Sequence, residues 1–154
     1  MKYIPQGLID ARLAGRKGVP AGFAQSSASR KEIERKAMEA VIEAEIALGY
    51  EPSDVSAKKF GYDILSFDPH NKRQRFIEVK GRIDGANTIM VTRNEIITSL
   101  NKPEDYILAI VQISQEFVQQ PRYVWRPFEV EPAFGVTAQQ FDLEHLLSKS
   151  EPPG

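Results

Sequence analysis

The stretch Gly61-Tyr-Asp-Ile-Leu-Ser-Phe-Asp-Pro-His-Asn-Lys-Arg-Gln-Arg-Phe-Ile-Glu-Val-Lys-Gly81 decides the fold of this sequence. Two strands are predicted within it, Tyr62 to Phe67 and Arg75 to Lys80, because polar and apolar side chains alternate along both runs. Between them, Asp68-Pro-His-Asn71 is rich in turn-forming residues. We therefore expect an antiparallel hairpin.

The polar face of this hairpin carries its chemistry. Strand alternation places Glu78 and Lys80 on one face and leaves Ile77 and Val79 to pack on the other. Antiparallel pairing would bring Asp63 towards Glu78 and Lys80. Two neighbouring carboxylates raise at least one pKa unless a cation lies between them, so the pattern favours a divalent metal such as Mg²⁺. The structural alternative is a solvated strand face with an ordinary ion pair.

Upstream of the hairpin, a helix is predicted from Arg30 to Leu48, because Ser29-Arg-Lys-Glu32 is a capping-box pattern. On a helical wheel, Glu34 and Glu45 fall inside its apolar face. A charge taken out of water is costly unless it is paired or bound to a metal. Glu45 is therefore predicted to support the site or to pair with Lys80 or an arginine, and for both acids an ion pair at the helix edge stays open.

Further motifs extend the pattern on both sides of the hairpin: Ile33-Glu-Arg-x-Ala-Met-x-x-Val41, Thr92-Arg-Asn-Glu95 and Tyr106-Ile-Leu-Ala-Ile-Val111. Together with Gly61-Tyr-Asp63 and Ile77-Glu-Val-Lys-Gly81, they resemble the family named after the C-terminal domain of the NO VEIN protein, within the PD-(D/E)XK restriction-endonuclease-like superfamily. The resemblance covers residues 30–114. Domains of this family are often the tail of large helicase-like ATPases in bacteria.

The resemblance implies an α/β fold with a restriction-endonuclease-like αβββαβ core, in which helices flank a mixed sheet. It implies metal-dependent hydrolysis of phosphodiester bonds in double-stranded DNA, together with a helicase or ATPase module in cis or trans. Asp63 and Glu78 would hold Mg²⁺ or Mn²⁺, with the backbone carbonyl of Val79 as a further ligand, and Lys80 would orient the attacking water. Glu34 matches the acid that the first core helix commonly adds.

Two other interpretations stay open. One is a catalytically inactive nuclease-fold module that binds DNA or docks a protein within a helicase system. The other is a structural domain whose charged cluster is a buried ion-pair network. Metal binding would separate the nuclease from the ion-pair network. DNA cleavage would separate the nuclease from the inactive module.

The remaining segments fit this core. The nearly all-apolar run Tyr106 to Ile113 predicts a strand buried on both faces. Thr92 to Glu95 is a capping box that predicts a helix to Leu100, and Thr137 to Gln140 predicts a terminal helix through Leu147. Shorter strands are predicted at Glu51 to Val55, Thr88 to Val91 and Arg122 to Trp125.

Three polar residues after the hairpin are candidate phosphate contacts. Arg82 opens a predicted polar loop, residues 82–87, that is long enough to close over a substrate. Arg93 and Asn94 lie at a predicted helix start, where free backbone N–H groups attract anions. Plain helix capping is the alternative for these two.

The composition suits one domain: 154 residues, 42% hydrophobic and 27% charged, with no cysteine and no run long enough for a membrane span. We expect an arm at residues 1–28, the nuclease-like domain at 29–150, a tail at 151–154, and a cytoplasmic location.

The net charge of −1 hides an asymmetry, since residues 1–36 carry 8 Lys and Arg against 3 Asp and Glu. No phosphate-binding glycine loop or nucleophilic triad is present, so the chain itself is no ATPase.

Overall fold

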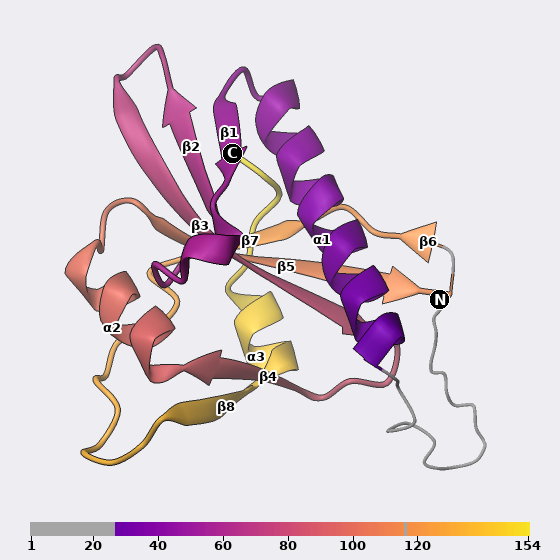
Figure 1. The fold of residues 1–154 in the computed structure, drawn as a ribbon, viewed down its shortest axis with the longest axis vertical. Coiled ribbons are helices and arrows are strands. Elements are labelled where there is room, and N and C mark those ends of the chain that lie inside the picture. The colour runs from indigo at the N-terminus through magenta and orange to yellow at the C-terminus, as the bar shows by residue number, and fades with distance from the viewer. Residues whose placement is uncertain (1–26, 116) are drawn as a thin grey trace.

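The computed structural model describes residues 27–115 and 117–154. Most of the predicted arm, residues 1–28, lies outside these ranges. The chain has the predicted α/β fold, a mixed sheet with helices on both faces (Figure 1). Helix α1 (Ser27–Ala47) starts two residues before the predicted capping box, and Gly49, with φ of 91°, follows its end. Glycine tolerates this left-handed conformation without a steric cost.

Six strands form the central sheet: β1 (Glu51–Asp54), β2 (Ile64–Asp68), β3 (Arg73–Ile83), β5 (Tyr106–Ser114), β6 (Phe117–Val118) and β7 (Arg122–Trp125). The order is β1-β2-β3-β5, and both β6 and β7 pair with β5. Only β3 and β5 are parallel among these pairs. Parallel strands need a crossover connection, and here it contains β4 (Thr88–Thr92) and helix α2 (Arg93–Asn101).

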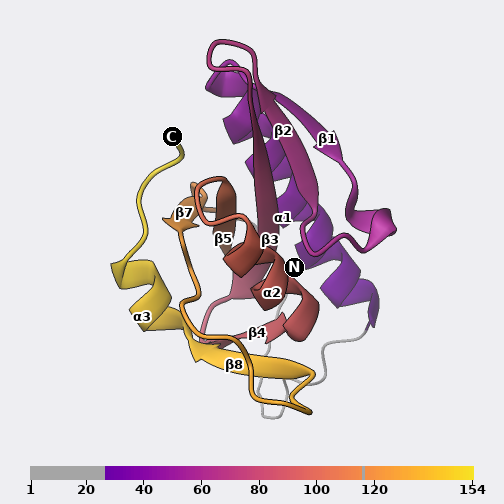
Figure 2. The same cartoon turned by 90° about the vertical axis from the view of Figure 1, so that its left-hand side faces the viewer.

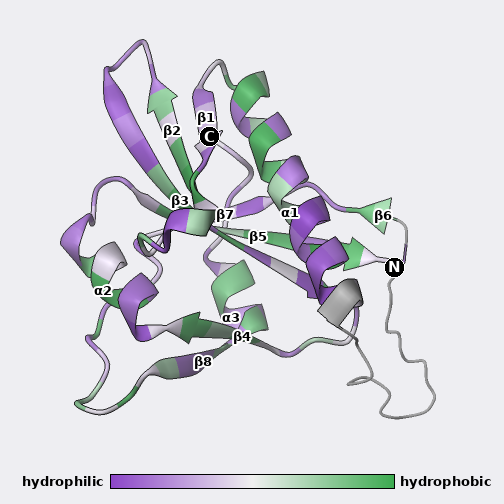
Figure 3. Cartoon of the chain, viewed as in Figure 1, coloured by the Kyte–Doolittle hydropathy of each residue, from purple (hydrophilic) through white to green (hydrophobic). Residues whose placement is uncertain are grey.

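The two faces of the sheet bury different groups of residues. Helix α1 covers one face, where Ile33, Val41 and Ile77 belong to one apolar cluster. Helix α2, β4 and the C-terminal elements cover the other face (Figure 1, Figure 2). Strand β5 contributes Ile107 to the first cluster and Leu108 to the second, which explains why its sequence is apolar at nearly every position (Figure 3).

The C-terminal region corrects one prediction. Residues 137–140 do not open a helix: β8 (Ala138–Asp142) pairs with β4 in a separate two-stranded sheet, in which Ile89 is opposite Phe141. Helix α3 (Leu143–Ser148) begins after β8, and the Asp142 carboxylate caps it by accepting the N–H of His145 at 2.8 Å. The fourth predicted strand, β4, therefore exists but lies outside the central sheet.

Strand β3 is longer than predicted. It runs from Arg73 to Ile83, and its last residues, Arg82 and Ile83, pair with Gln112 and Ile113 of β5. Arg82 is therefore a strand residue, and the predicted loop is confined to residues 84–87. Between β1 and β2, the chain forms a short 3-10 helix, η2 (Ser56–Lys58). None of the helices in the described ranges is both long and apolar enough to cross a membrane.

Candidate active site

The β2–β3 hairpin positions the first two acids. Ile64 of β2 is opposite Ile77 of β3, which places Asp63 beside the Glu78 and Val79 segment. The backbone N–H of Asp63 donates to the carbonyl of Ile77 at 2.8 Å, and its Oδ2 accepts the N–H of Val79 at 2.9 Å. Backbone and side chain of Asp63 are thus both held against β3.

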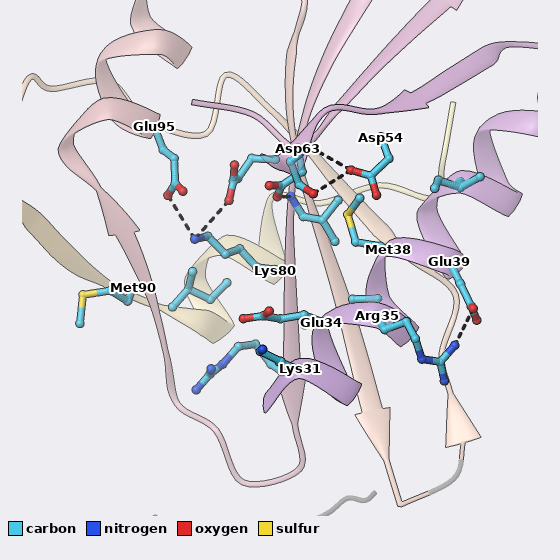
Figure 4. Close-up of a pocket in the computed structure, with 18 of the residues that line it drawn as sticks. Lys31, Glu34, Arg35, Met38, Glu39, Asp54, Asp63, Lys80, Met90 and Glu95 are labelled. Atoms are coloured by element: carbon cyan, nitrogen blue, oxygen red, sulfur yellow. Dashed lines mark hydrogen bonds and ion pairs between the residues drawn. The ribbon is translucent and has the colours of Figure 1, made fainter. Parts of the chain in front are cut away.

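A cavity of about 820 Å³ opens beside this hairpin, between α1, β3 and α2. The structure brings all four predicted site residues, Glu34, Asp63, Glu78 and Lys80, to its lining. In Figure 4 the labelled side chains of Glu34, Asp63, Lys80 and Glu95 converge on this space.

Lys80 forms ion pairs with two acids. Its Nζ lies 3.2 Å from Oε2 of Glu78 and 3.1 Å from Oε1 of Glu95. The side chains of Lys80, Glu78 and Glu95 are 19%, 5% and 16% exposed, so the ammonium is largely removed from water. The sequence prediction missed Glu95 as a site residue and treated it only as the capping residue of α2. The available signal was its place in the Thr92-Arg-Asn-Glu95 motif of the resemblance.

Burial dominates the electrostatics of these groups. It raises the pKa of Asp63, against the opposing effect of the Val79 N–H. Burial also raises the pKa of Glu78 well above its usual value, and the charges of Asp63 and Glu95 add to this although Lys80 opposes it. For Lys80, burial disfavours the ammonium, but Glu78 and Glu95 outweigh it and raise its pKa. Glu78 and Glu95 therefore share one ammonium, and Asp63 lies near enough for the same charge to lower its pKa against the effect of burial.

Glu34 does not lie on the buried face of α1, where the helical wheel placed it. It lines the cavity but is exposed, rather than inside the apolar face of α1. The buried stripe of the helix runs through Ile33, Ala37, Val41 and Glu45, each four residues from the last. Glu34 follows Ile33 by one residue, about 100° round the helix, which places it at the rim of the cavity.

Glu45 confirms the prediction that a buried acid needs a partner, and the partner is an arginine. Its carboxylate has no exposed surface and accepts Nε and Nη2 of Arg75 at 2.9 and 3.0 Å. The Tyr123 hydroxyl adds a third hydrogen bond at 2.7 Å, and the Arg75 guanidinium lies 4.2 Å from the ring centre of Tyr50. Glu45 is absent from the lining of the cavity, so it does not support the site directly.

The three candidate phosphate contacts separate into two groups. Arg82 lines the cavity, its Nε is buried with no hydrogen-bond partner in the described part of the chain, and burial lowers its pKa. Arg93 and Asn94 are not among the lining residues. Asn94 Nδ2 donates to the Lys59 carbonyl at 3.5 Å. The Arg93 guanidinium instead holds a loop by donating to the carbonyls of Pro132, Ala133 and Val136.

Gly81, next to Lys80, lets helix α1 approach β3 closely. A Cβ on this residue would lie 3.0 Å from the Ala37 Cβ, 3.0 Å from the Ile33 Cγ2 and 3.3 Å from the Ile33 carbonyl oxygen. Only hydrogen fits without a shift, because such contacts are tighter than ordinary van der Waals distances. The helix that carries Glu34 therefore rests on the strand that carries Glu78 and Lys80.

Fold and cavity together define an α/β domain with a partly buried acid–lysine cluster at the edge of a β-hairpin. The family model described as "Protein NO VEIN, C-terminal" matches residues 33–124, which is more than half of the chain. The chain therefore belongs to this family, as its motifs predicted. No curated protein matches the sequence.

Proposed function

We propose that the cavity is the active site of a PD-(D/E)XK-type nuclease that hydrolyses phosphodiester bonds in DNA with Mg²⁺ or Mn²⁺. The observation that carries this proposal is an excess of buried acid: Glu78 and Glu95 both pair with the ammonium of Lys80, and Asp63 lines the cavity with them. Like charges in a poorly solvated site disfavour full ionisation. A divalent cation would remove this penalty.

The oxygen donors suit such an ion. Mg²⁺ is usually held by one or two carboxylates and keeps several waters. Asp63 and Glu78 would hold it, the Val79 carbonyl is the third candidate ligand, and Glu34 would support it from the rim. Within residues 27–115 and 117–154, no three Asp, Glu or His side chains form a ready-made metal cluster. The bound ion would polarise the phosphate and activate a water.

Lys80 would stabilise the negative charge that develops on the phosphate or orient the attacking water. Its ammonium is fixed between Glu78 and Glu95 before substrate arrives. A preorganised cation in a poorly solvated site stabilises developing charge more effectively than one in water. Arg82, whose buried Nε lacks a partner in the described chain, supplies a second cation for the phosphate.

A helicase or ATPase module in cis or trans would deliver the DNA to this cavity. The net charge of −1 gives the chain little long-range attraction for phosphates. Delivery by a larger partner would compensate for that weak attraction.

The second candidate function is DNA binding or protein docking without cleavage. The observation that favours it is the lack of a third clustered ligand among the described residues, together with the contact of Lys80 on Glu78. Such a domain would retain the charged cluster as an ion-pair network.

Titration calorimetry with Mn²⁺ and a DNA cleavage assay test the proposal on the parent protein, Glu78→Gln and Glu104→Gln. Glutamine at 78 keeps the shape of the side chain but loses the charge that attracts a hard cation. Glu104 is an exposed acid outside the cavity lining, and its variant is the matched control.

We expect the parent and Glu104→Gln to bind Mn²⁺ and cut DNA, and Glu78→Gln to do neither while keeping its fold. If the parent binds DNA but does not cut it in the presence of any divalent metal, the second candidate replaces the first. Cleavage by Glu78→Gln at the parent rate would place the active site elsewhere.

A further inference from the structure

A row of aromatic side chains lies beside the cavity. The rings of Phe60 and Tyr62 have centres 5.7 Å apart, and those of Tyr62 and Phe76 are 5.0 Å apart. Lys102 Nζ lies 4.4 Å from the centre of the Phe76 ring. Phe60, at the outer end of the row, is 50% exposed. One side of this row is therefore open to a ligand.

The exposure of Phe60 is built into the backbone on both sides of it. Lys59 and Gly61 both have positive φ, of 59° and 96°. The Gly61 carbonyl accepts the buried Tyr106 hydroxyl at 2.8 Å, and the Lys59 carbonyl accepts the Asn94 amide at 3.5 Å. With both flanking carbonyls anchored, the ring is held out of the core by the fold.

Gly61 also lies against helix α2. A Cβ on Gly61 would come within 2.3 Å of the Thr98 Oγ1, so the loop has no room to move towards the helix. A preorganised aromatic surface loses little conformational entropy when a ligand binds. Because Phe60 is held rigidly, it differs from the isolated apolar residues that are common on protein surfaces.

The segment that carries Phe60 and Tyr62 borders the cavity at both of its ends. Lys59 and Asp63, which flank Phe60 and Tyr62 in the sequence, both line the cavity. Lys58 and Lys59 are exposed directly before Phe60. An exposed aromatic ring that directly follows two exposed lysines matches the two parts of an unstacked nucleotide, a planar base and an anionic phosphate.

We propose that Phe60 is a stacking platform for an unpaired nucleobase, with Lys58 and Lys59 on the neighbouring phosphates. In a closed duplex the base faces are stacked on one another, so Phe60 reaches a base only where the strand is open. The cavity then receives single-stranded DNA, in place of the double-stranded substrate expected from the family resemblance. This inference rests on the proposed function only in taking the cavity to be a nucleic-acid site.

Fluorescence anisotropy tests the platform with a labelled single-stranded oligonucleotide and a blunt duplex of equal length. Ca²⁺ replaces Mg²⁺ to suppress cleavage. The variants are Phe60→Ala, Phe60→Trp as the rescue, and Phe117→Ala as the matched control, since Phe117 is a 65% exposed phenylalanine outside the cavity lining. A 2-aminopurine base within the single strand reports stacking directly, and thermal melts check that each variant folds.

We expect the parent to bind the single strand more tightly than the duplex. Phe60→Ala should weaken single-strand binding by roughly tenfold or more and abolish the 2-aminopurine signal, because base–aromatic stacking contributes strongly to such complexes. Phe60→Trp should restore both readouts, and Phe117→Ala should match the parent. Unchanged single-strand affinity in folded Phe60→Ala, or a parent that prefers the duplex or binds no single strand, overturns the inference.

The two proposals fail separately. A parent that never cuts DNA, but loses single-strand affinity in Phe60→Ala, keeps the platform and removes the hydrolytic function. A parent that cuts DNA while Phe60→Ala binds single strands as the parent does keeps the nuclease and removes the platform.

Discussion

Glu95 Oε1 accepts both the ammonium of Lys80, at 3.1 Å, and the backbone N–H of Thr92, at 3.0 Å. The Thr92 hydroxyl oxygen in turn accepts the backbone N–H of Glu95 at 3.1 Å, which completes the capping box of α2. A single carboxylate oxygen thus starts a helix and holds the buried cation of the site. The two roles can be separated by substitution.

Glu95→Gln should lower DNA cleavage with little effect on stability. Glutamine serves at this position of a capping box, but it has no charge to hold Lys80. Thr92→Ala should do the opposite: it loses the cap, costs about 0.5–2 kcal/mol of unfolding free energy, and leaves Lys80 paired. Thermal melts and cleavage rates on both variants check this, and equal cleavage by Glu95→Gln and the parent would contradict a role for Glu95 at the site.

Lys80→Met should impair both chemistry and stability. Cleavage should fall by roughly 10²- to 10³-fold, as for the loss of one charge-stabilising donor. The metal-free protein should lose roughly 3–5 kcal/mol, because Glu78 stays buried without its cation. Mn²⁺ should raise the melting midpoint more in this variant than in the parent. Lys72→Met, at an exposed lysine outside the cavity lining, is the control, and a large loss of stability with full cleavage would assign Lys80 a purely structural role.

The metal-free protein should lose stability as the pH rises from about 3.8, the usual pKa of an aspartate, through the raised pKa values of Asp63 and Glu78. The folded state binds these protons more tightly than the unfolded state, so their contribution is complete below the unfolded pKa values and is lost above the folded ones. Lys80 acts outside this window, because its raised pKa lies above its usual value of 10.5. Denaturant midpoints in EDTA across this range should fall less steeply for Glu78→Gln than for the parent. Parallel pH profiles would show that Glu78 takes up no proton on folding.

Glu45→Gln should destabilise the domain by roughly 3–5 kcal/mol, because the Arg75 guanidinium is left without its counter-charge in a buried site. Cleavage below the melting temperature should be unchanged, since Glu45 does not line the cavity. Glu104→Gln breaks the exposed pair with Arg126 and should cost less than about 1 kcal/mol. Urea unfolding of the parent, Glu45→Gln and Glu104→Gln measures these free energies. A loss of cleavage in folded Glu45→Gln would show that Glu45 affects the site.

Short-range patterns predicted much of this fold. Alternation and turn chemistry predicted the β2–β3 hairpin, and the same period of two placed Glu78 and Lys80 together on one face. The continuous apolar run predicted the buried strand β5. The cost of burying a charge predicted a partner for Glu45, although the choice between Lys80 and an arginine needed the structure.

The predictions that failed depend on contacts between distant segments. The signal at residues 137–140 describes a local helix start, but pairing with β4 satisfies the backbone there as a strand. The ion pair of Glu95 with Lys80 depends on α2 lying over the polar face of β3, which no local pattern encodes. Glu34 differed because its side chain is one residue away from the stripe that contacts the sheet.

Gly81 also fixes the width of the cavity. Its missing side chain lets Ile33 and Ala37 of α1 touch the β3 backbone one residue after Lys80. Any larger residue would act as a wedge: it would push α1 away from the sheet by a few tenths of an ångström and carry the rim residues Glu34 and Lys31 with it. The distance between Glu34 on α1 and Glu78 on β3 therefore depends on residue 81 having no side chain larger than hydrogen.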